Sequence, residues 1–269
     1  MRLLRSFIFN FVFYVGTALR MIVLSPFYFS VSRERAYRVV VQGWGRFVNR
    51  QMRWWAGATF EIEGLEHLPD GPCIIVPKHQ SAWDTILLLP WIPDSVFMLK
   101  RELIEMPLFG WYLKKQRQIA VDRAAKGRNM ADAILRTKAE VETGRQLIIF
   151  PEGTRRPPGA LPEYKRGIQK LYANLDIPVI PVVMHPGLFW PRGSFWRYGG
   201  HFKVRVLEPI APGMEPKAFF THLVETMERE SDQLLLETVA ANPQLPLPEI
   251  TQKRVDALKK NANPLAEMR

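Results

Sequence analysis

Cysteine is almost absent from this chain of 269 residues, which has Cys73 as its single thiol. One cysteine excludes an intrachain disulfide framework and a cysteine-rich zinc or iron–sulfur centre. Cys73 lies in an apolar run with no base beside it, so we expect a core position and not a nucleophile. Metal-ligand spacing is also missing among His67, His185, His201 and His222. The sequence therefore predicts no metal site.

Negative charge is scarce in the first 60 residues, which contain nine Arg, no Lys and Glu34 as the one acidic residue. The whole chain has a formal charge of +11, with 47% hydrophobic and 23% charged residues. This composition is globular, and its positive excess predicts an anionic partner such as nucleic acid, anionic lipid or a phosphorylated substrate. Residues 61–99 are net acidic and residues 201–269 nearly neutral. No continuous basic face results, and we expect no nucleic-acid partner.

A long uninterrupted apolar run is missing as well. Residues 7–31 are largely apolar, but Asn10, Arg20 and Pro26 interrupt them. A membrane-spanning helix needs about 20 consecutive apolar residues, so this segment is compatible with spanning a bilayer or with lying in its interface. The preceding positive charges would suit a signal peptide, but a small-residue cleavage site followed by a mature start is not evident, which disfavours that interpretation.

Residues 34–56 have the spacing of an amphipathic helix. Apolar residues recur at intervals of three and four, and arginines fill much of the remaining surface. The first set is Tyr37, Val40, Val41, Trp44, Phe47, Val48, Met52 and Trp55, and the second is Arg35, Arg38, Arg46, Arg50 and Arg53. Such a helix either packs on the protein core or lies in a membrane interface. We favour the membrane and expect a two-helix, membrane-anchoring arm over residues 1–57.

From residue 58 the pattern changes to short β-rich runs that alternate with helical stretches. The predicted strands are Thr59–Glu63, Cys73–Val76, Val96–Leu99, Gln118–Val121, Leu147–Phe150, Val179–Val183 and Phe202–Leu207. The predicted helices are Thr85–Leu89, Pro107–Lys115, Lys126–Thr143, Lys165–Asn174 and Pro216–Thr238. This alternation predicts an α/β domain over residues 58–240, with a mostly parallel sheet covered by helices. Residues 241–269 are rich in Pro, Asn and Lys, and we expect a loose C-terminal tail.

His79 and Asp84 follow the predicted strand Cys73–Val76. In parallel sheets, sites form at the carboxyl ends of strands, and a turn can bring these two side chains into contact. The carboxylate would then keep one imidazole nitrogen protonated and leave the other free to take a proton from a hydroxyl or thiol. A structural interpretation also exists, because Ser81 and Asp84 have the spacing of a capping box for the next helix.

A group of cations beside a glycine follows the predicted strand Leu147–Phe150. Gly153 lets the backbone approach a ligand closely. Arg155 and Arg156 carry planar guanidinium groups that suit phosphate. The alternatives are an anion site and a solvated basic loop, and we favour the anion site.

Two further segments extend this predicted anion site. Lys165 stands close to Gly167 at a predicted helix start, where free N–H groups favour an anion. Arg123 follows the predicted strand Gln118–Val121 and is either a third phosphate ligand or the ion-pair partner of Asp122.

These strand ends, in this order, resemble the glycerolipid acyltransferases, specifically the bacterial 1-acylglycerol-3-phosphate acyltransferases. The resemblance covers residues 70–185. The family's His-x4-Asp motif is similar to His79 through Asp84, and its Phe-Pro-Glu-Gly-Thr-Arg motif to residues 150–155 without a gap. The weaker matches are Gly110 and Ile119 through Arg123, Lys165 with Gly167, and Val179 through Val182.

The resemblance implies transfer of a fatty acyl group from a thioester to the free hydroxyl of 1-acyl-sn-glycerol 3-phosphate, which gives phosphatidic acid. It implies that His79 is the general base and that Asp84 orients and stabilises the imidazolium, without an acyl-enzyme. It assigns substrate binding to Arg123, Glu152, Gly153, Thr154, Arg155, Lys165 and Gly167. The chain departs from the family pattern at Lys78, where Asn is frequent, and at Arg156, where Ser is frequent. Both departures add positive charge and leave the catalytic groups in place.

The same resemblance implies no cofactor, only acyl-CoA or acyl-acyl carrier protein as co-substrate. It implies lysophosphatidic acid and an anionic membrane surface as partners, at the cytoplasmic face of the bacterial inner membrane. Two alternatives remain open at this point. One is an acyltransferase of the same superfamily that acts on another lysolipid, such as lyso-ornithine lipid. The other is a non-catalytic basic protein that binds membrane or nucleic acid.

Overall fold

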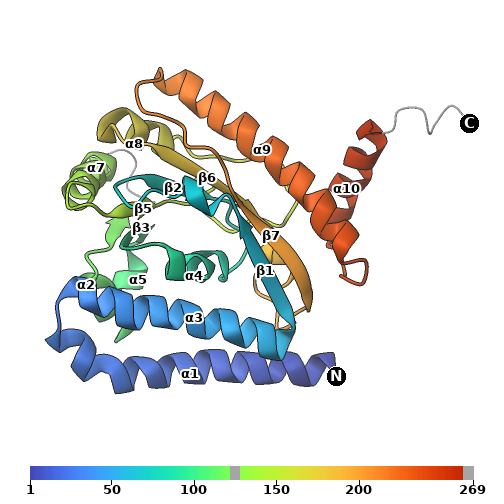
Figure 1. Ribbon diagram of the computed structural model, residues 1–269, viewed down its shortest axis with the longest axis horizontal. Helices are drawn as coiled ribbons and strands as arrows, with labels where there is room; N and C mark the ends of the chain where they lie inside the picture. Colours follow the sequence, from blue (N-terminus) through green and yellow to red (C-terminus); the bar gives the residue numbers. More distant parts are fainter. Residues whose placement is uncertain (122–127, 263–269) are drawn as a thin grey trace, which may run out of the picture.

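The computed structural model describes residues 1–121 and 128–262 (Figure 1). Within these residues, seven strands form one sheet in the order β1-β7-β6-β2-β5-β3-β4. The strands are β1 (Ala58–Glu63), β2 (Ile74–Pro77), β3 (Ser95–Lys100), β4 (Ile119–Val121), β5 (Gln146–Ile148), β6 (Val179–Met184) and β7 (Gly200–Val206). Neighbouring strands are parallel, except that β6 and β7 are antiparallel. The predicted α/β class with a mostly parallel sheet is confirmed.

The two faces of the sheet pack into separate cores, because successive side chains of a strand point to opposite faces. In β2, Ile74 and Val76 join one core, whereas Ile75 joins the other. The first core is covered by α7 (Arg128–Val141), α8 (Gly167–Leu175) and α9 (Pro216–Ala241), and the second by N-terminal helices and α4 (Asp84–Leu87). The sheet is therefore covered on both faces, as Figure 1 shows.

Two antiparallel helical rods form the N-terminal 56 residues. The first is α1 (Arg2–Ser30). The second runs from residue 33 to 56 through α2 (Arg33–Ala36), a π-helical turn η1 (Tyr37–Val41), α3 (Gln42–Gln51) and a second π-helical turn η2 (Met52–Ala56). The rods lie side by side along the lower edge of Figure 1. Pro26 lies inside α1 without ending it.

The apolar stripe predicted for residues 34–56 is turned mostly toward the protein, with Trp55 as an exposed member. Val48 and Met52 are buried in the core, and Trp44 donates its indole N–H to Thr17 Oγ1 of α1 at 3.1 Å. The large exposed apolar surface lies instead on α1, at Leu3, Leu4, Phe7, Phe11, Tyr14, Val15, Leu19, Ile22, Val23 and Phe29. The second rod thus packs on the body, and α1 presents the apolar face.

The remaining short elements connect the strands. They are η3 (Leu65–His67), η4 (Leu89–Trp91), α5 (Glu102–Glu105), α6 (Phe109–Lys115) and η5 (Pro186–Leu188). Gly144 follows α7 with φ of +92°, the left-handed conformation that glycine allows at a helix end. This agrees with the predicted end of that helix.

The expectation of a loose tail over residues 241–269 is wrong for residues 249–262, which form the helix α10 (Glu249–Ala262). Its Val255 is buried in the core, and its Thr251 hydroxyl donates to the Pro158 carbonyl at 2.7 Å. A few contacts of this kind hold a mostly polar helix on the body. Because so few of its residues are apolar, the sequence shows no clear amphipathic pattern for this helix.

Candidate active site

His79 and Asp84 meet just beyond the carboxyl end of β2. His79 Nδ1 lies 3.0 Å from Asp84 Oδ2. Asp84 is the first residue of α4 and its side chain is buried. Its carboxylate also accepts from the backbone N–H groups of Gln80 at 2.6 Å and Ser81 at 2.8 Å. The carboxylate therefore orients the imidazole and caps the turn at the same time, so both interpretations of this spacing apply.

The Asp84 contact determines the tautomer of His79. A carboxylate only accepts, so Nδ1 carries the proton and Nε2 presents a lone pair. Within the described residues, Nε2 has no hydrogen-bond partner. The ring stacks on Phe150, with centroids 4.0 Å apart, and 15% of the side chain remains exposed. His79 is thus held in a fixed plane with one basic nitrogen available.

A cavity of about 300 Å³ begins at His79 and Phe150. It extends along all of β3, from Lys100 at the carboxyl edge of the sheet to Ser95 at the amino edge. Six residues of strand correspond to roughly 17 Å. The arm supplies the opposite wall, through Thr17, Arg20, Met21, Tyr28, Tyr37, Val40, Val41 and Trp44. The lining is mostly apolar, so the cavity suits a linear hydrocarbon chain.

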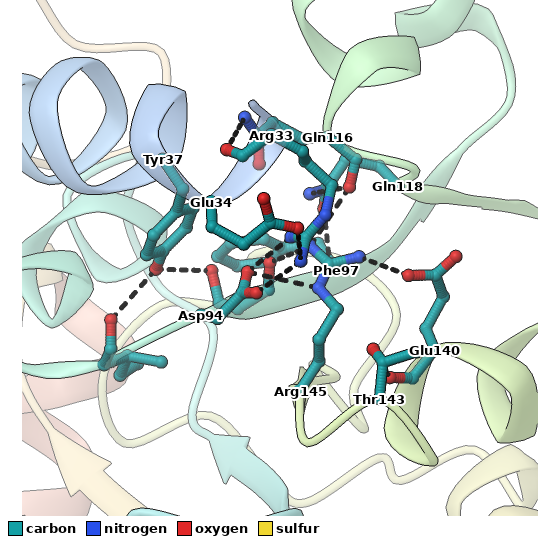
Figure 2. A network of polar contacts seen from close by, with 12 residues as sticks. Arg33, Glu34, Tyr37, Asp94, Phe97, Gln116, Gln118, Glu140, Thr143 and Arg145 are labelled. Carbon is teal, nitrogen blue, oxygen red and sulfur yellow. Dashed lines mark hydrogen bonds and ion pairs between the residues drawn. The ribbon is translucent and has the colours of Figure 1, made fainter. Parts of the chain in front are cut away.

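A network of buried and partly buried polar contacts, shown in Figure 2, lies at the amino-edge end of the cavity, where Ser95 and Gln116 belong to both. Arg33 of α2 forms two hydrogen bonds to Asp94, at 2.7 and 2.6 Å. Arg145 is fully buried and donates to Asp94 at 3.2 Å, to Glu140 at 2.8 Å and to the Ser95 carbonyl at 2.7 Å. This network ties the arm to the sheet beside the cavity.

Glu152 lies on the other side of His79 and is 2% exposed. Its Oε1 lies 3.4 Å from the His79 backbone N and 3.3 Å from Lys78 Nζ. Burial raises the pKa of the Glu152 carboxyl, and the charge of Lys78 opposes that rise. Lys78 also pairs with Glu228 of α9 at 2.6 Å. Glu152 therefore belongs to a buried ion cluster that supports the His79 loop.

The glycine and the two following residues form an exposed turn next to His79. Gly153 has φ of +67°, a conformation that disfavours other residues. Thr154 is exposed and Arg155 is partly exposed. The Arg155 guanidinium forms no ion pair with the described part of the chain. The neighbouring Arg156 N–H donates to the His79 carbonyl at 2.8 Å, which places this turn directly beside the imidazole loop.

Lys165 and Gly167 lie where the sequence predicts, at the start of α8. Gly167 is the first residue of that helix. Lys165 is exposed, and its ammonium pairs with Glu163 at 2.5 Å. Arg156 pairs with the same carboxylate. The Glu163 carboxylate therefore pairs with two cations of this rim, Arg156 and Lys165. Arg123 lies outside the described residues.

Two contributors to the site have no signal in the sequence. Glu228 is one, and the other is Arg192, whose Nη1 donates to Thr154 Oγ1 at 3.3 Å and to the Arg155 carbonyl at 2.9 Å. Arg192 is 37 residues from Arg155 in the chain, so no local motif indicates the contact. Within residues 1–121 and 128–262, no cluster of three or more His, Cys, Asp or Glu could hold a metal ion.

Comparison with known proteins agrees with this geometry. A family model described as Acyltransferase matches residues 59–185. A 1-acyl-sn-glycerol-3-phosphate acyltransferase of Pseudomonas aeruginosa is 34% identical over 204 residues, which cover 76% of this chain and 78% of that protein. The chain therefore belongs to the acyltransferase family, the class that the fold and the His79 site also define.

Particular relatives extend the comparison. The crystal structure of a 1-acyl-sn-glycerophosphate (LPA) acyltransferase from Thermotoga maritima superposes with a TM-score of 0.72 and 26% identity, over 87% of this chain and 98% of that one. A chloroplastic 1-acyl-sn-glycerol-3-phosphate acyltransferase of Brassica napus is 34% identical over 137 residues, 50% of this chain and 40% of that protein. The likeness thus reaches from bacterial to plant enzymes.

Proposed function

We propose that this acyltransferase moves a fatty acyl group from an acyl thioester to the free hydroxyl of 1-acyl-sn-glycerol 3-phosphate, giving phosphatidic acid. One observation carries the proposal: the His79–Asp84 pair lies where an apolar cavity meets a rim of cations. The relatives from P. aeruginosa and T. maritima, which are named for this acceptor, support it.

His79 acts as the general base in this proposal. Its Nε2 takes the proton of the acceptor hydroxyl as the oxygen attacks the thioester carbonyl carbon. The tetrahedral intermediate then collapses, the C–S bond breaks, and the imidazolium returns its proton to the leaving thiolate. Asp84, fixed by two backbone N–H groups, stabilises the imidazolium through Nδ1–H. The acceptor oxygen attacks directly, so no acyl-enzyme forms.

The cationic rim binds the acceptor phosphate. Arg155 lies beside the His79 loop and forms no ion pair within residues 1–121 and 128–262, and Lys165 and Gly167 lie at the start of α8. Gly153 and Thr154 shape the turn that carries Arg155, and Arg123 is assigned to the same role from the family motif. Glu152 organises this region from inside, because its carboxylate faces the His79 backbone and Lys78.

The cavity along β3 binds the acyl chain of the donor. Its mouth contains His79, so a chain lying in it would present its thioester to Nε2. The donor is acyl-CoA or acyl-acyl carrier protein, and no cofactor takes part. Either donor carries phosphates outside the cavity, where exposed cations such as Lys100 lie at the mouth.

The protein binds the cytoplasmic face of the bacterial inner membrane, with α1 lying in the interface. By length and composition, α1 is the one helix of the described residues that could cross a membrane. Its inner face, however, contacts the rest of the protein near both ends and in the middle, at Phe9 against Trp190, at Tyr28 against Tyr112 and at Thr17 against Trp44 of α3. A spanning helix would have to withdraw from these contacts, whereas an interfacial helix keeps them.

The test is a transfer assay with purified protein in mixed micelles. It uses lysophosphatidic acid, a lysolipid without phosphate and lyso-ornithine lipid as acceptors, with acyl-CoA and acyl-acyl carrier protein as donors. We expect phosphatidic acid, detected by mass, as the dominant product. Faster turnover of lyso-ornithine lipid than of lysophosphatidic acid would assign the other acceptor. Absence of thioester consumption with all acceptors would overturn the proposal.

A further inference from the structure

The segment 191–197 connects the cationic rim to the membrane arm. At its start, Arg192 donates to the Thr154 hydroxyl and to the Arg155 carbonyl. At its end, the Arg197 N–H donates to Ser6 Oγ of α1 at 3.0 Å. Asn10 of α1 donates to the Phe195 carbonyl at 2.8 Å. The segment therefore touches both α1 and the turn beside His79.

Arg197 fixes the position of this segment. It is 3% exposed, and its guanidinium lies 4.5 Å from the Trp190 ring and 5.3 Å from the Phe9 ring. It also donates to Asn10 Oδ1 at 2.6 Å. Burial lowers the pKa of Arg197 to about 10, so its charge is retained at neutral pH. A buried, charged anchor of this kind holds the segment against α1.

Between these anchors the segment exposes two aromatic side chains. Phe195 is 43% exposed and Trp196 is 39% exposed, and their rings meet edge to face at 5.7 Å. They stand next to the part of α1 that exposes Phe7 and Phe11. Tryptophan and phenylalanine in such a position continue an apolar face and favour the bilayer interface.

Arg192 retains capacity for an anion. Its Nη1 makes both contacts to the turn, while Nε and Nη2 have no partner within the described ranges. The side chain is exposed and lies beside the turn that carries Arg155, because it donates to the Arg155 carbonyl. A guanidinium group with such N–H donors suits a phosphate, since arginine forms bidentate contacts to its oxygens.

We propose that the segment 191–197 inserts Phe195 and Trp196 into the membrane interface and that Arg192 is a further binding residue for the acceptor headgroup. The proposal rests on the proposed function. The occupant is the anionic lipid surface, because the exposed aromatic pair is held against α1 by the Asn10–Phe195 hydrogen bond, next to the exposed Phe11, and Arg192 supplies positive charge in the same segment. A lysolipid in the bilayer then reaches Arg155 and His79 past Arg192.

The first experiment compares Arg192→Ala with Arg229→Ala, an exposed arginine of α9 with the same change in charge. Acceptor KM, donor KM and kcat are measured with lysophosphatidic acid and with monoacylglycerol, which lacks the phosphate. Hydrogen bonds to charged groups contribute about 1.5–3 kcal/mol, so we expect Arg192→Ala to raise the KM for lysophosphatidic acid about 10- to 100-fold. The donor KM, the KM for monoacylglycerol and all values of Arg229→Ala stay unchanged.

Arg192→Lys tests whether Arg192 binds the acceptor headgroup or only supports the turn at Thr154 and Arg155. Lysine keeps the charge, so partial recovery of the acceptor KM supports a headgroup contact. An equal rise in KM for acceptors with and without phosphate would overturn the assignment of Arg192. If the unmodified protein transferred no acyl group, the proposed function itself would be wrong. The membrane contact of the segment 191–197 would still be tested by the vesicle experiment below.

The second experiment uses vesicles and places a fluorescent probe on the segment. Cys73 is buried, so Trp196→Cys can be labelled selectively with an environment-sensitive dye. Met214→Cys is the control, because Met214 is exposed and its backbone N–H donates to Tyr172 of α8, on the face of the sheet that the N-terminal arm does not cover. With vesicles of phosphatidylcholine and phosphatidylglycerol, we expect a blue-shifted, stronger emission at position 196 and no change at 214. Unchanged emission at 196 while the protein floats with the vesicles would overturn the membrane contact.

Discussion

The two ends of the apolar cavity carry polar networks that differ in what they leave unpaired. At the amino edge of the sheet, all three guanidinium nitrogens of Arg145 donate to carboxylates or backbone carbonyls (Figure 2). At the carboxyl edge, Asp84 is equally satisfied, but His79 Nε2 and the Arg155 guanidinium are without partners in the described structure. In the first network the buried atom left without a partner within the described residues is the neutral Gln116 Oε1, whereas the second leaves a basic nitrogen and a cation for a substrate.

This contrast separates support from chemistry in a chain with many buried charges. Burial alone does not distinguish Arg145 from Asp84, since both are nearly inaccessible. What distinguishes the two edges is an unpaired basic or cationic atom next to a cavity, supported by fully paired neighbours. Substitutions at the two edges should therefore affect different quantities, activity at one and stability at the other.

The largest effect is expected at the carboxyl edge. His79→Ala removes the proposed general base, which is typically worth about 10²–10⁴-fold in rate, and we expect kcat to fall at least that far. His79 makes few contacts besides Asp84 and Phe150, so urea unfolding should be nearly unchanged. Asp84→Asn, which keeps acceptor capacity for the backbone N–H groups, serves as the companion variant. Normal turnover in His79→Ala would contradict the assignment of activity to the carboxyl edge and stability to the amino edge.

The counterpart at the amino edge is Arg145→Met. Removing one partner of a buried ion pair costs about 3–5 kcal/mol, because Asp94 and Glu140 keep their charges and lose a donor. Urea denaturation measures this loss, with Arg136→Met as control, since Arg136 pairs with Asp132 at the exposed surface and should lose less than about 1 kcal/mol. We expect kcat per folded molecule to be preserved. A stable but inactive variant would show that this edge also serves the reaction.

A pH series examines the support beneath the catalytic loop. His185 is buried, with Nδ1 3.0 Å from the Gln80 amide and Nε2 2.9 Å from the Ser231 carbonyl. Desolvation lowers the pKa of His185 from 6.5 to about 4. Between those values the unfolded chain binds a proton that the folded chain does not, so stability falls as pH decreases from 6.5 to 4, by on the order of 3 kcal/mol.

The measurement for His185 is urea denaturation between pH 7 and 4. His185→Gln should be less stable at pH 7 and should lose the additional acid sensitivity, so its stability curve should be flatter over this window. Parallel curves for the two proteins would contradict the assignment of the pH dependence to this residue.

The smallest effect is expected for the ion cluster that links α9 to the imidazole loop. Lys78 lies between Glu152 and Glu228, and the Tyr164 hydroxyl donates to Glu228 at 2.7 Å. Lys78→Met leaves both Glu152 and Glu228 without the ammonium, whereas Glu228→Gln leaves Lys78 paired with Glu152 alone. The double variant removes the Lys78–Glu228 pair and leaves Glu152 without its cation. We expect a coupling energy of about 1–3 kcal/mol in a double-mutant cycle of unfolding free energies. If the two single substitutions changed the free energy of unfolding additively, Lys78 and Glu228 would not be coupled, and the cluster would not support the His79 loop.

Much of the fold and half of the site could be predicted from the sequence, because the relevant signals are local. Continuous apolar runs such as Cys73–Val76 predict buried parallel strands, and the residues after each run lie at the carboxyl edge of the sheet. The spacing of His79 and Asp84 predicts a contact because both residues occupy one turn. The start of α8 at Gly167 and the end of α7 at Gly144 are also local signals.

The rest depends on partners far apart in the chain. In the sequence, Lys78 is only a departure from the family motif. Its role as an ion-pair partner becomes visible in the structure, where Glu228, 150 residues away, lies beside it. Arg192 and Arg145 look like ordinary surface cations until the chain folds, after which one joins the rim and the other is fully buried. For residues 34–56, periodicity predicts an apolar stripe but does not specify the surface it covers, and here that surface is α1 and the sheet.

The shared wall between the arm and β3 has a practical consequence. Trimming the chain near residue 57 to obtain a more soluble enzyme would also remove Tyr37, Val40 and Trp44, and with them one side of the compartment proposed for the fatty tail. The proposed attachment to lipid and the proposed binding of the donor therefore cannot be separated by truncation. Detergent or nanodisc preparations of the intact chain are the material in which kinetics and ligand-bound crystals should be sought.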